Sequence, residues 1–493
     1  MIGGLRGAAS RLALAVIVSA VGAVAFAQKP AKAADLGGDC CSDLEERIAE
    51  LEATTVRKGN KKVSVTLYGK VNRAMLFWDD GHEQNAYSVD NSYESTRFGV
   101  KGSAKIGGNW SGGYRIETEI RSAASEAVNQ IDDDDGTRSG GVLGNESRLL
   151  LLRHSFVYLD NKKWGQVRLG LTYTPKDDIT KDTDVTELED TMTSDNHMNR
   201  GFFLRPKGFN REVGSGAGTV PAGIPGQLKW QAISQCYGST SAFDCSTRRN
   251  GVAYWSPSFL GSKDGKGFTF SWGWFEDDIW GGALRYHDEW GPNWEFGGGV
   301  AYEKYRDENI QNSGGGLAGF KRDIDEWAGM ASLKHKPTGL FAFGAFSFSD
   351  NNDSNRQNAG VFTGTSSPDM SAWDARVGIQ RDVPWFGLDK LGETSIFGGY
   401  LEINDGIGGA CGATRRCGAG TFPDLAIPTE ITGSKVTRWY LGYDQSMVSG
   451  YIHLYGVYQH LTADVDLVDA SLARVGEPLD DFDLFYTGMR MYY

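Results

Sequence analysis

From Val63 to the last residue, apolar and polar side chains alternate with a period of two, and this pattern constrains the fold more than any other feature. In the first such segment, Val65, Leu67 and Val71 fall on one face, while Tyr68 and Lys70 fall on the other. A period of two predicts β-strands whose faces meet different surroundings. The segments are about as long as the 9–11 residues with which a strand crosses a membrane, and longer than the strands typical of a soluble sandwich.

The connections between these segments are alternately short and long. Outer-membrane barrels have short periplasmic turns and long external loops, so this rhythm predicts an all-β, transmembrane antiparallel β-barrel of about sixteen strands. Such a barrel leaves an aqueous channel. One predicted external connection, 277–279, departs from the rule because it is only a tight hairpin. The predicted strands are 63–77, 95–106, 110–121, 148–159, 165–172, 250–259, 268–276, 280–288, 294–305, 324–335, 340–349, 371–381, 393–403, 436–444, 450–461 and 482–493.

Aromatic residues concentrate near the ends of these segments. Tryptophan and tyrosine prefer the two membrane interfaces, where a ring is apolar on one side and hydrogen-bonded on the other. We therefore expect aromatic girdles, although core aromatics of a sandwich would give a similar list. The expected girdle residues are Trp78, Trp110, Trp164, Trp280, Trp294, Trp327, Trp373 and Tyr458.

Residues 1–27 have the pattern of a signal peptide. Arg6 and Arg11 precede a short apolar run that ends in Ala25-Phe26-Ala27. This pattern favours cleavage after Ala27, with Ala33 or Ala34 as alternatives, over a transmembrane anchor, which needs a longer apolar run. The chain has a net charge of −13, and removing this segment makes it more acidic, which argues against nucleic acid as a partner.

Residues 28–62 combine a linker of small residues with one short helix signal. Ser42 and Glu45 have the spacing of a capping box, and Leu44, Ile48 and Leu51 form an apolar seam. A helix this short is marginal alone in water, so we favour a periplasmic coiled coil between subunits over a lone helix on the barrel rim. Residues 63–493 then form the barrel.

Four of the six cysteines fall in pairs that are close in sequence. Cys236 and Cys245 lie in one long loop, and Cys411 and Cys417 lie in another. In an exported protein such pairs are predicted to be disulfides, with free thiols as the alternative. The pairing of the adjacent Cys40 and Cys41 stays open.

Several segments resemble the Gram-negative general (diffusion) porins. The sequence at 95–102, STRFGVKG, is similar to the second strand of that family, and 153–159 followed by 164–170 is similar to its fourth and fifth strands. Tyr173-Thr174-Pro175 resembles the entry to its third external loop, and the chain ends on an aromatic residue, Tyr493, as outer-membrane proteins do. The predicted helix joined directly to the first strand is similar to the alphaproteobacterial branch.

This resemblance implies a passive, water-filled channel for small hydrophilic solutes and ions. It further implies a homotrimer in contact with outer-membrane lipid and lipopolysaccharide, no cofactor and no enzymatic activity. In that family the third external loop folds into the barrel, and its acids face arginines on the wall. A charged constriction of this kind filters solutes by size and charge.

In this chain the candidate constriction loop is 173–249. Arg97 and Arg153 match the family's constriction arginines by motif, and Arg115 and Arg168 point inward by alternation alone, as do Lys70, Glu117, Arg376 and Arg438. The length of the loop leaves open which of its acids reach the constriction. The candidates are Asp182, Asp184, Glu187 and Glu189.

Other functions find less support. No Gly-x-Ser-x-Gly motif, phosphate loop or Cys/His metal spacing is present, so neither a barrel enzyme nor a metal site is predicted. The acidic run 132–135 lacks the glycine spacing of a calcium loop and is interpreted as a solvated loop. A substrate-specific channel for sugars or carboxylates stays open, with Tyr68, Tyr451 and Tyr455 as a possible aromatic slide, and so does a soluble secreted β-protein.

Overall fold

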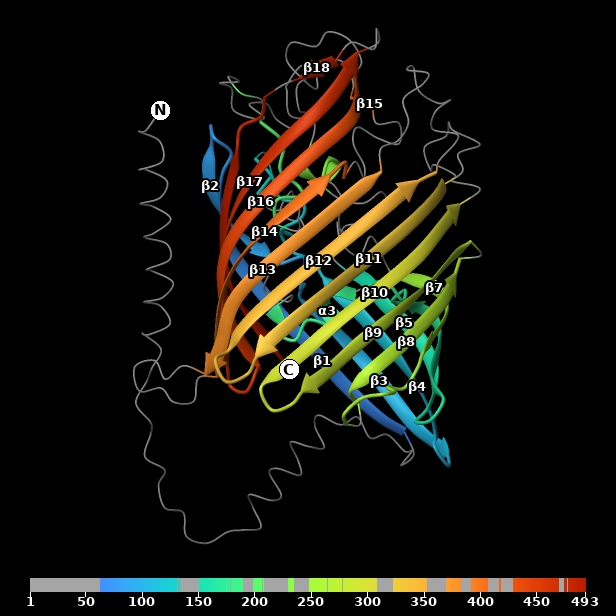
Figure 1. Cartoon of the computed structure of the whole chain (residues 1–493). Helices are drawn as coiled ribbons and strands as arrows, with labels where there is room; N and C mark the ends of the chain where they lie inside the picture. The colour runs from blue at the N-terminus through green and yellow to red at the C-terminus, as the bar shows by residue number, and fades with distance from the viewer. Residues whose placement is uncertain are drawn as a thin grey trace, which may run out of the picture.

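The computed structural model is a closed barrel, and its strands run diagonally around a central lumen (Figure 1). It describes residues 63–130, 132–133, 150–177, 179–188, 198–205, 207, 229–234, 248–263, 265–276, 278–307, 322–352, 369–382, 392–406, 416–417, 429–469, 474–476 and 478–493. The predicted signal peptide, the linker and the coiled-coil helix lie outside these ranges, so they stay predictions. Within them, no helix is long and apolar enough to span a membrane.

Nineteen strands pair antiparallel in one sheet, and sixteen of them form the wall. These sixteen are Val63–Asp79 (β1), Arg97–Gly107 (β3), Trp110–Ile120 (β4), Leu150–Asn161 (β5), Gly165–Thr172 (β6), Arg249–Trp255 (β7), Gly267–Phe275 (β8), Ile279–Trp290 (β9), Trp294–Asp307 (β10), Arg322–His335 (β11), Leu340–Asn351 (β12), Met370–Asp382 (β13), Glu393–Asn404 (β14), Thr429–Met447 (β16), Ile452–Asp469 (β17) and Phe482–Tyr492 (β19). The short strands Gln84–Asp90 (β2), Arg416–Cys417 (β15) and Arg474–Gly476 (β18) extend the extracellular end.

The first and last strands close the barrel. Lys70 to Asp79 of β1 pair with Asp483 to Tyr492 of β19, so the sheet has no free edge. A closed sheet satisfies its backbone hydrogen bonds internally, which is the condition for crossing a lipid bilayer with strands. The sequence prediction of about sixteen strands with short and long connections in alternation is therefore confirmed, including the tight hairpin between β8 and β9.

Some strand bounds differ from the prediction. β7 ends at Trp255, because Pro257 lacks the backbone N–H that a longer strand would need. The hairpin of β16 and β17 extends further than predicted, to Thr429 and Asp469, and includes parts of the segments expected to be loops. This hairpin and β18 project above the rest of the barrel in Figure 1.

The outer face is apolar, as the alternation predicts. Leu67, Val71, Val157 and Leu169 are all exposed, and they lie on the outer face of their strands. Exposed tryptophans mark the expected girdles: Trp110, Trp164, Trp280, Trp294, Trp327 and Trp373.

Part of the inner face is apolar, which the alternation alone does not predict. In the extracellular half of β1, β14, β16, β17 and β19, inward side chains form an apolar patch that is buried by residues of the 173–249 loop. Trp78, predicted for a girdle, lies in this patch: its ring is 5.3 Å from Phe202 of the loop, which in turn is 5.1 Å from Phe482. We call it the inner apolar patch. Its inward members are Leu76, Trp78, Leu401, Ile403, Val436, Val457, Leu461, Phe482, Leu484 and Tyr486.

The same packing overturns part of the predicted aromatic slide. Tyr455 is fully buried, and its hydroxyl donates to Asn72 Oδ1 over 2.6 Å. Tyr451 lies in the periplasmic turn before β17, and only Tyr68 faces the middle of the lumen. These three rings therefore do not form a continuous track.

Candidate functional site: the lumen and its loop

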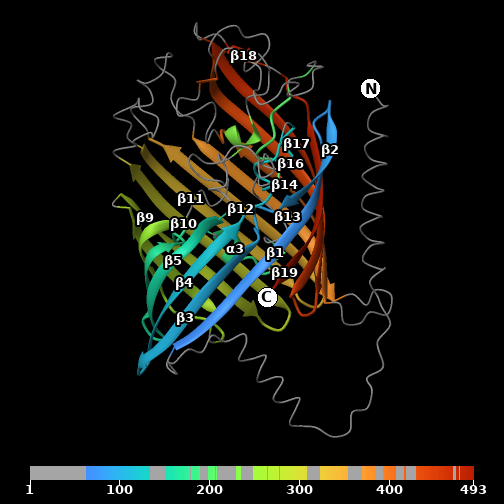
Figure 2. The same ribbon diagram turned by 180° about the vertical axis from the view of Figure 1, so that it is seen from behind.

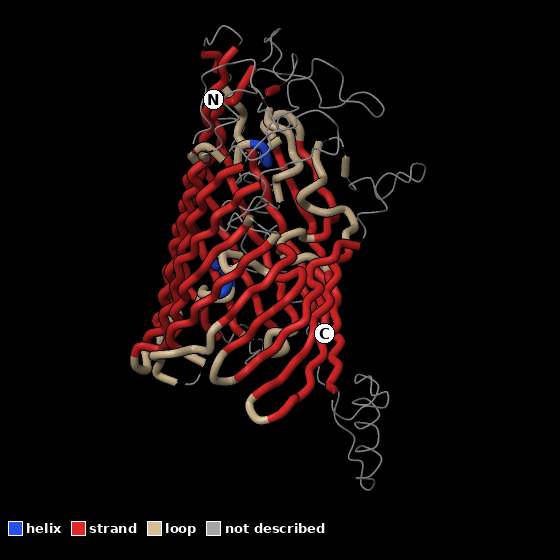
Figure 3. The backbone as a smooth tube through the Cα atoms, turned by 90° about the vertical axis from the view of Figure 1, so that its right-hand side faces the viewer, coloured by secondary structure: helices blue, strands red, loops and turns tan. Residues whose placement is uncertain are grey.

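The third external loop enters the lumen directly after β6. The strand stops at Thr172, and the short helix Ile179–Asp182 (α3) lies inside the barrel, as Figures 1 and 3 show from two sides. Further along the loop, Trp230 of the single turn Trp230–Ala232 (η3) is buried, and its ring centroid lies 5.8 Å from that of Phe482 of β19. The described part of the loop is thus folded into the barrel, and its role as a constriction stays a prediction.

Small residues on the inner wall leave a trough for this loop. The side chain of Ile179 packs among Ala283, Ala301 and Ala328 of β9, β10 and β11. At Gly297 a Cβ atom would lie 2.0 Å from the carbonyl oxygen of Thr183, so a glycine is needed for the loop to approach the wall. The inward small residues of β9–β11 thus fix the depth of α3.

Hydrogen bonds between wall side chains and the loop backbone then prevent the loop from sliding along the wall. Ser332 donates its hydroxyl to the carbonyl of Thr183 over 3.0 Å and accepts the N–H of Val185 over 3.0 Å. Gln380 donates to the carbonyl of Thr186 over 2.7 Å. Together with the trough, these bonds attach residues 179–186 to the wall of β9–β13.

Two ion pairs complete this attachment. Lys176, whose side chain is fully buried, pairs with Glu326 of β11. Arg285 of β9 donates to the carbonyl of Pro175 over 2.7 Å and reaches Asp182 over 3.2 Å. Only the Lys176–Glu326 pair is removed from water, since the side chain of Asp182 is about half exposed. We therefore expect the loss of this first pair to cost far more than that of a surface pair.

The wall made by β1, β3, β4 and β5, whose strands are seen in Figure 2, lies across the lumen from the loop. Its inner face carries a network of charges. Glu117 lies at its centre and accepts from Arg115 over 2.5 Å and from Arg153 over 3.1 Å, with Arg97 at 3.5 Å. Glu119 accepts from Arg153 over 2.6 Å. We call this the Glu117 network.

A β-bulge places Arg153 in this network. The pairing of β4 with β5 shifts between Glu117 and Thr118, so that Glu117 opposes His154 and Thr118 opposes Leu152. The extra residue leaves both Arg153 and His154 buried on the inner face, although neighbours in a regular strand point to opposite faces. The bulge re-aims Arg153 into the lumen.

The four predicted arginines therefore differ in their surroundings. Arg97 and Arg153 are about 8% exposed and tied to glutamates. Arg115 is more open and shares Glu117 with them. Arg168 of β6 is half-buried and bonds Gln166 over 2.6 Å, with no carboxylate in contact among the described residues.

The predicted loop acids also differ in their exposure and in their partners. Asp182 is exposed to the lumen while bonded to Arg285. Asp184 is buried, accepts the hydroxyl of Thr186 over 2.8 Å and lies 3.7 Å from Arg376, so it anchors the loop rather than facing the pore. Glu187 is exposed on the periplasmic side of the loop, and Glu189 lies outside the described residues.

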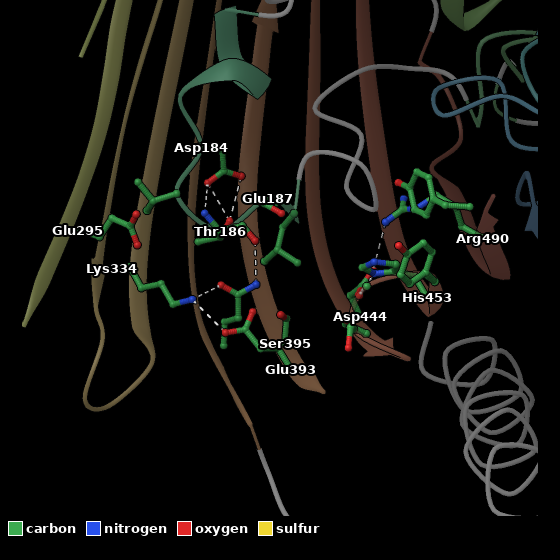
Figure 4. Close-up of a pocket in the computed structure, with 18 of the residues that line it drawn as sticks. Asp184, Thr186, Glu187, Glu295, Lys334, Glu393, Ser395, Asp444, His453 and Arg490 are labelled. Carbon is green, nitrogen blue, oxygen red and sulfur yellow. Dashed lines mark hydrogen bonds and ion pairs between the residues drawn. The ribbon is translucent and has the colours of Figure 1, made fainter. Parts of the chain in front are cut away.

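Below the loop, the lumen opens into a cavity of about 630 Å³ (Figure 4). Glu187 lines it from the loop, and Lys334, Asp444, His453 and Arg490 line it from the wall. His453 shares a hydrogen bond of 2.8 Å with Asp444. The lining is therefore charged with both signs, as suits a vestibule filled with water.

Sequence reasoning did not identify the residues that attach the 173–249 loop to the wall. Lys176, Ser332 and Gln380 carry no motif, and only the glycines and alanines of β9–β11 signal that something approaches the wall closely. Arg205 attaches the later part of the loop to Asp80 over 2.6 Å and to Glu83 over 2.7 Å. In the described part of the chain, no group of three or more His, Cys, Asp or Glu side chains is placed to hold a metal ion.

Most cysteines of the two predicted disulfides lie outside the described residues. Cys236, Cys245 and Cys411 lie outside the described residues, and Cys417 is described only as part of the backbone of β15. Both pairs stay predictions.

A family model for the Gram-negative porins matches residues 13–466. The chain belongs to the Gram-negative porin family. This porin therefore forms an outer-membrane channel and is not an enzyme. Among curated proteins, none matches it.

Solved structures similar to this porin include proteins from three bacteria. The anion-selective porin from Comamonas acidovorans is 17% identical with a TM-score of 0.48, covering 88% of this chain and 100% of that chain. OmpT of Vibrio cholerae in its trimer form is 13% identical with a TM-score of 0.45, covering 88% and 100%. OmpF of Salmonella typhi in complex with daunomycin is 13% identical with a TM-score of 0.44, covering 88% and 99%.

Proposed function

We propose that small hydrophilic solutes and ions cross this porin by passive diffusion through a constriction between the loop segment 173–188 and the Glu117 network. The observation that carries this proposal is the attachment of α3 to the inner wall, which places the exposed Asp182 and Glu187 on one side of the lumen. The partly exposed Arg115 and Arg168 lie on the other side. Charges of both signs across a narrow section create a transverse field that filters solutes by charge as well as size.

Substitution of the wall arginines tests the constriction. Arg153→Ala removes a positive charge and leaves the carboxylates of Glu117 and Glu119 less compensated, so we expect the reversal potential in a KCl gradient to shift toward K⁺; Arg97→Ala should shift it in the same direction. A unit charge about 5 Å from the ion path contributes about 0.8 kcal/mol in water, or about a fourfold change in local ion concentration. Arg306→Ala, which removes a charge from the outer face, is the control. Unchanged reversal potentials in both lumen variants would exclude these arginines from the constriction.

We further propose that the functional unit is a homotrimer. Lipid-facing walls carry aromatic girdles, yet β1, β3, β5 and β6 have no exposed tryptophan within the strands, whereas β8–β11 carry six. The outer face of β1, β3, β5 and β6, which lacks exposed tryptophan within the strands, thus fits contact with a second subunit better than contact with lipid. The predicted coiled coil of residues 43–52, of alphaproteobacterial type, would join the same subunits after export by the predicted signal peptide.

Insertion into planar bilayers tests the trimer. Each insertion event should raise the conductance in three equal steps, or close in three equal steps at high voltage. A preparation that conducts only in single, independent steps would contradict the trimer while leaving the channel itself intact.

Lipopolysaccharide is the proposed lipid partner at the external rim. Lys304 of β10 points outward above the exposed ring of Trp327 and bonds Asp323 and Asp325 over 2.5 Å each, with Arg306 nearby. Such outward charges at the external interface suit headgroups that carry phosphates and divalent cations.

A further inference from the structure

The lumen wall of β5, β6 and β7 carries a cation stacked between aromatic rings. The guanidinium carbon of Arg168 lies 3.8 Å from the ring centroid of Trp255 and 5.3 Å from that of Phe156. Strand pairing places all three on the inner face, because Arg168 opposes Ala253 and Tyr158, and Gln166 opposes Trp255. We call Arg168, Trp255, Phe156 and Tyr158 the aromatic shelf.

The charge of this shelf is not neutralised by the wall. Arg168 uses Nε for Gln166, and its two Nη atoms make no hydrogen bond with any described residue. Asp182 of α3 attracts Arg168 electrostatically, but its carboxylate bonds Arg285. By contrast, Arg97 and Arg153 contact two glutamates each. Arg168 thus belongs to the predicted constriction set and keeps both Nη atoms without a hydrogen bond to the described residues.

The neighbouring wall of β1, β3 and β4 also places cations beside an aromatic ring. Tyr68 of β1 lies beneath Arg115, whose Nε donates to its hydroxyl over 2.7 Å, and Lys101 lies 5.4 Å from the centre of the same ring. Lys101 faces the lumen and is exposed. A solute that leaves the shelf therefore meets a second cation beside an aromatic ring.

We propose that this shelf is a binding subsite for small planar carboxylates, such as aromatic acids; the inference rests on the proposed diffusion path through this lumen. A carboxylate accepts two parallel hydrogen bonds from the free edge of a guanidinium, and a flat ring extends the existing stack on Trp255. A saturated ring of equal size makes the same ionic contact but packs less well against a flat surface. The subsite would thus distinguish solutes of equal charge and size by their shape.

Benzoate and cyclohexanecarboxylate are matched probes for this inference. With the full chain in planar bilayers, we expect millimolar benzoate to reduce the KCl current, and cyclohexanecarboxylate to need about tenfold more for the same reduction. Arg168→Gln should abolish the reduction by both anions. Trp255→Leu should remove the preference between them and keep the weaker ionic effect.

Two variants on the outer face serve as controls for general effects of substitution on folding. Trp272→Leu removes an exposed ring from β8, on the opposite face of the same wall, and Arg306→Gln removes an outward charge; both should behave as the wild type. Equal reduction by both anions in the wild type, or a preference that survives Trp255→Leu, overturns the planar subsite while the KCl conductance still supports the channel. A chain without any KCl conductance would overturn the proposed diffusion path instead.

Discussion

Replacing Lys176 with Met is expected to release the constriction loop from the wall without unfolding the barrel. The side chain of Lys176 is fully buried against Glu326, and the variant leaves that carboxylate buried beside Glu303 without its cation. Removing one partner of a buried pair costs about 3–5 kcal/mol. A loss of about 3 kcal/mol raises the fraction of detached loop by about two orders of magnitude.

The expected readout is a noisy open channel with frequent brief closures, recorded on single channels. Lys176→Met with Glu326→Leu should return to quiet gating, because replacing both charges by apolar groups of similar volume is often neutral. Lys304→Met breaks an ion pair on the outer face and serves as the control. If Lys176→Met conducts as quietly as the wild type, this ion pair does not hold the loop.

The strands could be predicted because one physical cause determines them. A wall between lipid and water requires alternation, and alternation gives both the strands and the face of each residue. It assigned Arg115 and Arg168 to the lumen correctly, and it placed Glu117 there without showing that Glu117 joins three arginines. The pairings depend on neighbours across strands, which the period of two does not specify.

The wrong predictions for Trp78 and Asp184 also have a physical cause. Alternation says which face a side chain occupies but not what covers that face, so Trp78 was expected at a girdle when a loop residue, Phe202, buries it inside. Asp184 was expected in the pore because loop acids are abundant, whereas Arg376 and Thr186 hold it against the wall. Arg153 was found by motif alone, since the bulge that turns it inward has no signature in the sequence.

The Glu117 network has a second consequence, which concerns the sign of the selectivity. Glu117 is about 1% exposed and is contacted by three guanidiniums and by the hydroxyl of Tyr68 over 2.8 Å. Glu117→Gln keeps the size and an acceptor oxygen but removes the charge. Arg97, Arg115 and Arg153 then share fewer carboxylates, and the lumen becomes more positive.

We therefore expect Glu117→Gln to shift the reversal potential in a KCl gradient toward Cl⁻, opposite to Arg153→Ala and by a similar factor of about four. The double variant Glu117→Gln with Arg153→Ala restores the net charge and should return close to the wild type. Glu402→Gln, which neutralises an outward glutamate paired with Lys435 over 3.0 Å, should leave the potential unchanged. Should both single variants shift toward the same ion, the field at the narrowest section must arise from residues other than this network, since a local network requires opposite signs.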